Sequence, residues 1–236
     1  MKNQYFGDIN DYRKYGLIRL LANDGKIKTG ICWMLTPDDT RTDGKFTEYL
    51  YDSRKYRMFA PDLYDFLRKC VGSKKRCLLE AENSNIFPNI IFHNPILKDD
   101  ANQRKQYFSD MCKLFEDVDL IFFDPDNGLE VKSKPLGKKD SSKFLYWSEV
   151  IDSYNAGHSI LLYQHFIRED RDKFIARIVA DIRDKTGSNN ISYFRTSNVV
   201  FFLIAQDKHS QYFSDKAKII SSMWDGQIQV FPNTLT

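Results

Sequence analysis

The chain has 236 residues, of which 42% are hydrophobic and 28% charged, and its formal net charge is +3. This length and balance fit one folded domain over residues 1–236 and exclude a disordered or fibrous chain, while so mild a charge does not by itself indicate a nucleic-acid partner. The sequence contains neither the run of roughly 18 to 20 apolar residues that a membrane helix needs nor a secretory signal, so we expect a cytoplasmic protein without a membrane partner.

In the first half of the chain, amphipathic segments of helical period alternate with short apolar runs of strand length. A helix over 10–23 is expected to end at Asp24-Gly25, and Pro61 is expected to open another. The elements predicted up to residue 116 are a helix (10–23), a buried strand (29–35), a polar loop (36–44), a helix from 61, a segment that fits helix or strand (74–82), a strand (89–93) and a helix (100–116).

The second half continues this alternation and then changes rhythm. NISYFRT and NVVFFLIA are two strand-like runs separated by a short polar turn, which predicts an antiparallel hairpin. The predicted elements are a buried strand (118–123), a helix (142–154), a buried strand (159–164), a helix (170–185), the hairpin, a last helix (209–224) and a short strand (227–231).

Strands that are apolar throughout, alternating with helices, predict a sheet that is covered on both faces and is therefore largely parallel. We expect an α/β fold, a doubly wound Rossmann-like sheet that is mostly parallel and carries a C-terminal antiparallel hairpin. In such sheets ligands bind beyond the carboxyl ends of the strands.

The stretch FFDPDNGLEV, residues 122–131, ends a buried strand in two aspartates. Asp124 and Asp126 would repel each other and resist burial unless a cation, a ligand or water shares them. Asp and Asn are also ordinary turn formers, so a solvated turn is the alternative explanation. Because the preceding strand is so apolar, we favour a ligand site.

Other polar segments also follow predicted parallel strands, which places them at the same edge of the sheet. The strand 29–35 runs into a loop with Asp38, Asp39 and Asp43, and the strand 159–164 runs into His165 and Arg168. We therefore predict one shared ligand cleft at this edge.

Two further segments have both a functional and a structural explanation. The loop after DPDNG carries Lys132, Lys134 and Lys138, which would guide a phosphate-bearing substrate to the cleft or simply face solvent. Near the N-terminus, Asp8 and Asp11 flank a helix start, where capping explains one carboxylate more readily than two.

The chain resembles the J-type bacterial large-subunit ribosomal RNA adenine-N6 methyltransferases. In the resemblance, FGDINDYRKYG matches the family's N-terminal segment, with Lys14 at its lysine and Tyr15 at its histidine. DPDN matches the catalytic Asp-Pro-Pro-Tyr, so Asp124 and Pro125 keep the first two positions, whereas Asp126 and Asn127 replace the second proline and the aromatic residue. The strand, helix, hairpin and final helix that follow have the same order.

The resemblance implies a pocket for S-adenosylmethionine (SAM) and a catalytic segment of Asp124, Asp126 and Asn127. SAM would lie over the strand ends, and the expected cofactor-binding residues are Lys14, Tyr15, Asp38, Asp39 and Glu80. The expected substrate-binding residues are Lys132, Lys134, Lys138, His165 and Arg168, and the substrate would be RNA, DNA or a nucleotide.

Two alternatives remain at this point. Asp124 and Asp126, with an acid from 36–44, would hold Mg²⁺ in a phosphodiesterase or nuclease, because Mg²⁺ prefers oxygen ligands. The other alternative is a non-catalytic nucleic-acid-binding protein that retained the methyltransferase fold and contacts its partner through the lysine-rich loop.

Overall fold

The computed structural model describes residues 1–22, 25–40 and 44–232. Within them, the main sheet has the strand order β2-β1-β3-β6-β8-β7-β9. The strands are β1 (Thr29–Cys32), β2 (Ile90–His93), β3 (Leu120–Phe123), β6 (Ser159–His165), β7 (Ile191–Arg195), β8 (Val199–Ile204) and β9 (Gln229–Phe231), and β4 (Gly128–Leu129) pairs separately with β5 (Phe144–Leu145).

The sheet is mostly parallel. Strands β2, β1, β3 and β6 pair in parallel, and β8 pairs antiparallel with both β6 and β7, so that β7 runs in the same direction as β6. The β7–β8 hairpin confirms the predicted antiparallel hairpin, and the structure confirms the predicted α/β fold class. Strand β9 adds an antiparallel edge.

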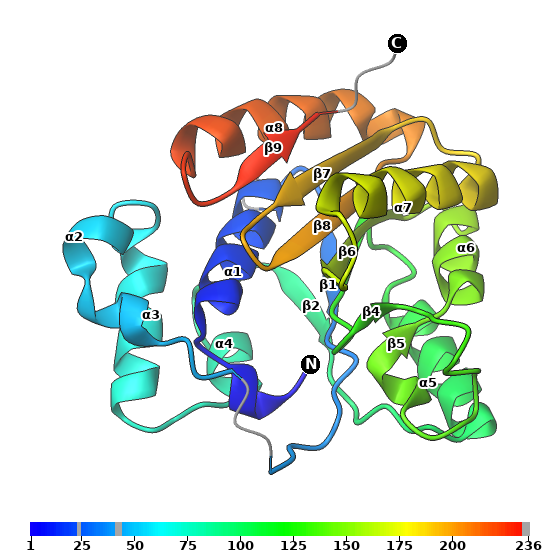
Figure 1. Cartoon of the computed structure of the whole chain (residues 1–236), viewed down its shortest axis with the longest axis horizontal. Helices are drawn as coiled ribbons and strands as arrows, with labels where there is room; N and C mark the ends of the chain where they lie inside the picture. The colour runs from blue at the N-terminus through cyan, green and yellow to red at the C-terminus, as the bar shows by residue number, and fades with distance from the viewer. Residues whose placement is uncertain (23–24, 41–43, 233–236) are drawn as a thin grey trace.

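Helices cover both faces of the sheet (Figure 1). The longer ones are α1 (Ile9–Ala22), α3 (Pro61–Gly72), α5 (Ala101–Leu114), α6 (Trp147–Asn155), α7 (Arg171–Thr186) and α8 (Ser210–Met223), and α2 (Ser53–Tyr56) and α4 (Leu78–Glu82) are short. Four single-turn 3₁₀ helices complete the described part: η1 (Asn3–Tyr5), η2 (Glu48–Tyr51), η3 (Ser141–Lys143) and η4 (Asp207–His209).

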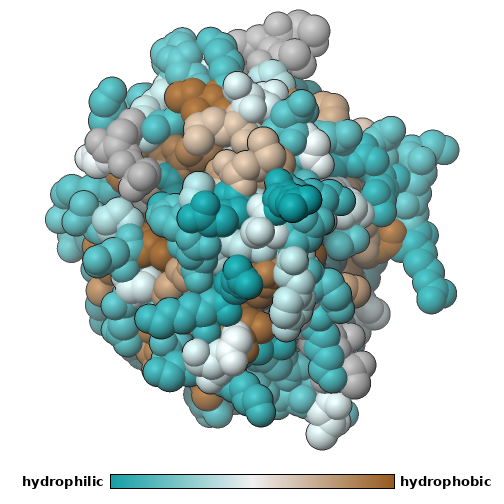
Figure 2. Space-filling view, turned by 90° about the vertical axis from the view of Figure 1, so that its left-hand side faces the viewer, coloured by the Kyte–Doolittle hydropathy of each residue, from teal (hydrophilic) through white to brown (hydrophobic). Residues whose placement is uncertain are grey.

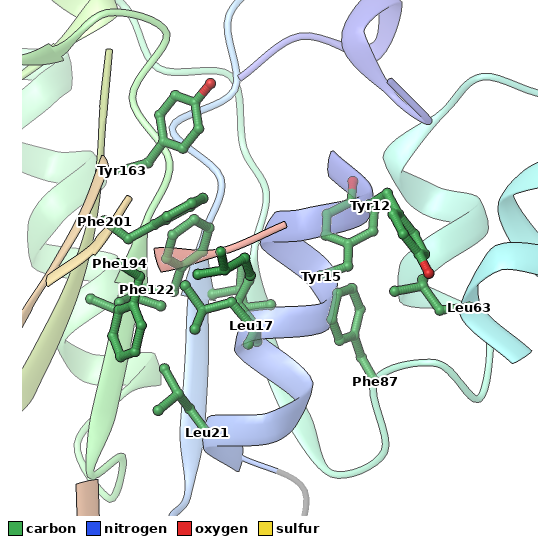
Figure 3. Packing of buried hydrophobic residues seen from close by; sticks show 14 of the residues in the cluster. Tyr12, Tyr15, Leu17, Leu21, Leu63, Phe87, Phe122, Tyr163, Phe194 and Phe201 are labelled. Atoms are coloured by element: carbon green, nitrogen blue, oxygen red, sulfur yellow. The ribbon is translucent and has the colours of Figure 1, made fainter. Parts of the chain in front are cut away.

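Alternate residues of each central strand enter two separate hydrophobic cores, as the period of a strand requires. Phe122 packs in the core beneath α1, α3 and α8, whereas its neighbours Ile121 and Phe123 pack in the core beneath α5, α6 and α7. Figure 3 shows Leu17 and Leu21 of α1 directed toward the side chains of the sheet, with Tyr12 and Tyr15 on the opposite side of the helix. Helix α1 is therefore buried on two sides.

Local sequence explains where the helices begin and end. The side chain of Asp170 accepts hydrogen bonds from the backbone N–H groups of Asp172 and Lys173 at the start of α7, and Gly187 ends that helix in a left-handed conformation, φ 69°. Asp100 caps α5 in the same way.

The helix predicted over 142–154 begins only at Trp147, so its first part was wrong. Residues 141–143 form a 3₁₀ turn, and Phe144–Leu145 pair with Gly128–Leu129 instead. Arg104 of α5 donates hydrogen bonds to the carbonyl groups of Ser141 and Phe144, at 3.1 and 2.7 Å. These contacts with a distant helix use carbonyl groups that a helix would need for its own hydrogen bonds.

No helix among the described residues is both long enough and apolar enough to cross a membrane. The side of the molecule that carries α2 and α3, seen in Figure 2, is mainly hydrophilic, with hydrophobic side chains gathered in a few places. Tyr51 and Met58 are among the exposed hydrophobic residues.

Candidate functional site

A cavity of about 670 Å³ lies where β3 and β6 end, beside the start of α1. The chain passes from β1 to β2 on one side of β1 and then crosses to β3 on the other, and such a switch point is where open α/β sheets bind ligands. The described residues that line the cavity come from the N-terminal segment, α1, residues 44–48, the end of β3 and the end of β6. They are Met1, Tyr5, Asp8, Asn10, Asp11, Lys14, Gly44, Lys45, Phe46, Glu48, Asp124, Pro125, Asp126, Asn127, Tyr163, His165 and Phe166.

Lys14 lines this cavity and forms ion pairs with both Asp11 and Asp124. Its Nζ lies 2.7 Å from Asp11 Oδ1 and 2.7 Å from Asp124 Oδ2, and all three side chains are buried. Burial alone would lower the pKa of Lys14, but the two carboxylates together raise it above its ordinary value. Nζ also lies 5.4 Å from the centre of the Tyr163 ring, a cation–π contact. Lys14 is therefore a fixed, buried cation between two carboxylates.

Asp8 and Asp11 have different partners at the start of α1. Asp8 Oδ1 accepts the backbone N–H groups of Asn10 and Asp11, at 2.7 and 3.1 Å, which caps the helix. Asp11 Oδ2 accepts the N–H of Gly7. Burial, followed by the nearby charge of Asp11, raises the pKa of Asp8 to about 7. Asp8 thus gains and loses a proton near neutral pH at the cavity wall.

Asp126 is held in place by two donors. Thr36 Oγ1 donates a hydrogen bond to its Oδ2 at 2.6 Å, and the N-terminal ammonium of Met1 lies 2.7 Å from its Oδ1. Burial alone would raise the pKa of Asp126, but the ammonium group holds it below its ordinary value. The same ammonium donates to the carbonyl groups of Met34 and Asp124, so it joins the end of β3 to the segment after β1.

Gly128 completes the turn after Asp126 because no larger residue fits there. Its φ is +99°, and an added Cβ would lie 2.3 Å from the side-chain oxygen of Gln164. That oxygen accepts the N–H of Leu129 at 2.7 Å. The glycine of DPDNG therefore packs the turn closely against β6.

The end of β6 supplies two neutral polar rings to the wall. Tyr163 Oη and His165 Nε2 are 3.1 Å apart, in hydrogen-bond contact. Burial lowers the pKa of His165, and burial together with the charge of Asp124 raises the pKa of Tyr163 well above its ordinary value. Both side chains are therefore uncharged near neutral pH.

The structure brings together five of the predicted site residues and leaves the others outside the cavity wall. Lys14, Asp124, Asp126, Asn127 and His165 all line the cavity.

The predicted cofactor-binding residues other than Lys14 do not line the cavity. Tyr15 is fully buried in the core, where its ring centre lies 5.2 Å from that of Phe87. The carboxylates of Asp38 and Asp39 accept hydrogen bonds from Gln4, and that of Asp39 also pairs with Lys2. Glu80 lies on α4. Asp43 lies outside the described residues.

The predicted substrate-binding lysines also lie away from the cavity wall, as does Arg168. Lys132 and Lys138 are exposed, and Lys134 pairs with Asp140 at 2.8 Å. The loop that carries them is held against α5, because the side chain of Asp99 accepts the backbone N–H groups of Asp140 and Ser142.

Sequence reasoning missed much of the wall, including Tyr163, Asn10 and Phe46. Tyr163 lies within an apolar strand, where its hydroxyl group gave no signal of a site. Asn10 is the second residue of α1, and Phe46 lies near the start of that helix only through the folding of the chain, since its carbonyl group accepts the N–H of Ile9 at 3.0 Å. The pairing of two acids near a helix start, Asp8 and Asp11, was the signal that marked this part of the wall.

Within residues 1–22, 25–40 and 44–232, no group of three or more His, Cys, Asp or Glu side chains is arranged to hold a metal ion. Comparison with protein families, curated proteins and solved structures finds no match to this chain.

Proposed function

We propose that the protein is a SAM-dependent methyltransferase that binds its cofactor in the cavity at the end of β3 and methylates an amine. The observation that carries this proposal is the position of Asp124-Pro125. This dipeptide, which matches the start of the methyltransferase Asp-Pro-Pro-Tyr motif, lies at the switch point of the sheet and lines a cavity of about 670 Å³. This volume falls within the range of roughly 300 to 1,000 Å³ that is typical of pockets for small molecules and cofactors.

The described wall is chemically suited to SAM, which carries a sulfonium and an ammonium group. Asp8 and Asp11 offer carboxyl groups beside the start of α1, and Asp124 offers another at the end of β3. We infer that Asp8, Asp11 and the Asp124 segment hold the cofactor. When bound, SAM supplies an electrophilic methyl group.

Asp124 is the residue that would orient the acceptor amine. Its carboxylate accepts a hydrogen bond from Lys14, and its remaining acceptor positions are suited to an amine N–H. Holding the amine in line with the methyl group provides the proximity on which such a transfer depends. Lys14 holds the Asp124 carboxylate in place through its Nζ and is a positioning residue.

The experiment is calorimetric titration with SAM and with S-adenosylhomocysteine, followed by a methyl-transfer assay. We expect both to bind, and we expect Asp124→Asn to reduce transfer at least tenfold while Asp117→Asn, an exposed acid elsewhere, has no effect. Absence of SAM binding, or transfer that is unchanged in Asp124→Asn, would contradict the proposal.

A further inference from the structure

The charges of the cavity wall bear on its substrate. Among the described lining residues, five carboxyl groups face only three cationic groups. Two of the three, Lys14 and the ammonium of Met1, are in ion pairs with buried aspartates. A phosphate group would therefore approach a wall with an excess of like charge, which costs free energy in so confined a site.

The lysines that would bind a nucleic-acid backbone are elsewhere. Lys132, Lys134 and Lys138 do not line the cavity, and Lys134 and Lys143 both pair with Asp140 at 2.8 Å. Tight nucleic-acid binding depends on several cations placed along the phosphates, so the described wall lacks the feature that RNA or DNA requires.

The same wall offers acceptors to a ligand that donates hydrogen bonds. Asn10 lines the cavity, and its Oδ1 is buried without a hydrogen-bond partner among the described residues. A buried unpaired acceptor is costly, so a ligand N–H bound there would gain more than an ordinary hydrogen bond. The carboxyl groups of Asp8 and Asp124 are further acceptors of the same wall.

An exposed aromatic ring adds a surface for stacking. Phe46 lines the cavity although 61% of the residue is exposed, which is unusual for so large an apolar side chain. Its backbone is held by hydrogen bonds: its carbonyl group accepts the N–H of Ile9, and Arg76 donates to the carbonyl group of Gly44, two residues earlier. Phe46 is therefore an aromatic ring of the wall that is available for stacking.

From these observations we propose that the cavity accepts a small planar heterocycle that bears an amino group and no phosphate, of the nucleoside type, and does not accept a nucleic-acid chain. The amino group donates to Asp124 and Asn10, and the ring stacks on Phe46. This assignment rests on the proposed methyltransferase function for its chemistry, but the binding that it predicts is measurable without methyl transfer.

Two sets of probes test the proposal by calorimetry. The first is cytidine, uridine and cytidine monophosphate. The second, with S-adenosylhomocysteine saturating the cofactor site, is adenosine, inosine and adenosine monophosphate. Uridine and inosine replace the amino group by a carbonyl group, and the monophosphates add charge. In at least one set we expect the amino nucleoside to bind at least tenfold more tightly than both analogues.

Variants assign this binding to the cavity. We expect Phe46→Ala to weaken binding of the amino nucleoside at least tenfold and Asn10→Ala to weaken it at least threefold, whereas Tyr51→Ala, which removes another exposed ring outside the cavity wall, leaves it unchanged. Tighter binding of a monophosphate or of a single-stranded hexanucleotide than of the nucleoside would overturn the proposal, as would absence of nucleoside binding. If SAM fails to bind but the nucleoside binds as expected, only the proposed function fails.

Discussion

The ammonium group of Lys14 lies 2.7 Å from a carboxylate oxygen of Asp124, which is 110 positions further along the chain. The contact joins the second turn of α1 to the end of β3, and both side chains are 2% exposed. It links α1 to the sheet at the cavity, beside the contacts that the Met1 ammonium makes with Asp124 and Asp126.

Replacing Lys14 by Met leaves Asp11 and Asp124 as buried carboxylates without their cation. We expect a loss of about 3 to 5 kcal/mol in the free energy of unfolding, because removing one partner of a buried ion pair leaves the other as an uncompensated buried charge. Urea unfolding measures it. The matched control is Lys113→Met, since Lys113 is exposed and its Nζ lies 3.8 Å from Asp110. Equal stability of the two variants would show that the Lys14 network contributes nothing.

Asp8 makes stability depend on pH in a direction opposite to that of most carboxylates. Burial raises its pKa from 3.8 to about 7, so between these pH values the folded protein binds a proton that the unfolded chain releases. The stabilisation is complete below about pH 4 and is lost as the pH rises through 7, at up to about 1.4 kcal/mol per pH unit.

Asp8→Asn isolates this effect, because Asn also caps helices but does not titrate. We expect the free energy of unfolding of the wild type, minus that of Asp8→Asn, to fall steadily between about pH 4 and pH 7. Urea unfolding at several pH values measures the difference, in which titrating groups that do not interact with Asp8 cancel. A difference that rises with pH would mean that Asp8 is ionised and favourably paired in the folded state.

Arg104 holds the loop of residues 131–146 against α5. It is 1% exposed, its Nη2 lies 2.8 Å from Glu149, and it donates to two carbonyl groups of the loop. We expect Arg104→Met to cost about 3 to 5 kcal/mol and to speed tryptic cleavage after Lys138 and Lys139.

Arg177→Met is the control for Arg104, because Arg177 makes a half-exposed pair with Glu169. Its expected cost is below about 1 kcal/mol. Cleavage of the lysine-rich loop at the wild-type rate in Arg104→Met would mean that Asp99 alone holds the loop.

Gly16 lies inside α1, where alanine would ordinarily stabilise a helix by about 1 kcal/mol. Here an added Cβ would lie 2.1 Å from the buried ring of Trp224, so we expect Gly16→Ala to destabilise the protein by about 1 to 3 kcal/mol and to alter tryptophan fluorescence. Gly72→Ala, at the end of α3 with nothing near its Cβ, should be neutral or slightly stabilising. Thermal unfolding of both variants compares them.

The sheet was predictable from the sequence because its central strands are buried on both faces. Such strands appear as uninterrupted apolar runs, and Leu120–Phe123 and the Ile160–Tyr163 part of β6 are clear examples. The boundary of α6 was not predictable, because Arg104 decides it from a helix about 40 residues away. The short strands β4 and β5 were missed because two residues are too few to show the alternation of a strand.

The candidate site was predictable only in part. The rule that parallel strands end at one edge correctly placed Asp124 and His165 at one cavity. The rule says nothing about which cation meets which acid, and the pairing of Lys14 with Asp124 depends on how α1 packs across the sheet. Phe46 lies at the cavity in a segment that is held by the N–H of Ile9 and the side chain of Arg76, contacts without any sequence signature.

The long sequence separation between Lys14 and Asp124 also bears on how the protein folds. A ribosome releases α1 well before β3 has been made, and closing so long a loop is slow relative to forming local helices. The cavity is therefore assembled late, and any fragment that stops short of β3 lacks the wall that Asp124 and its neighbours supply.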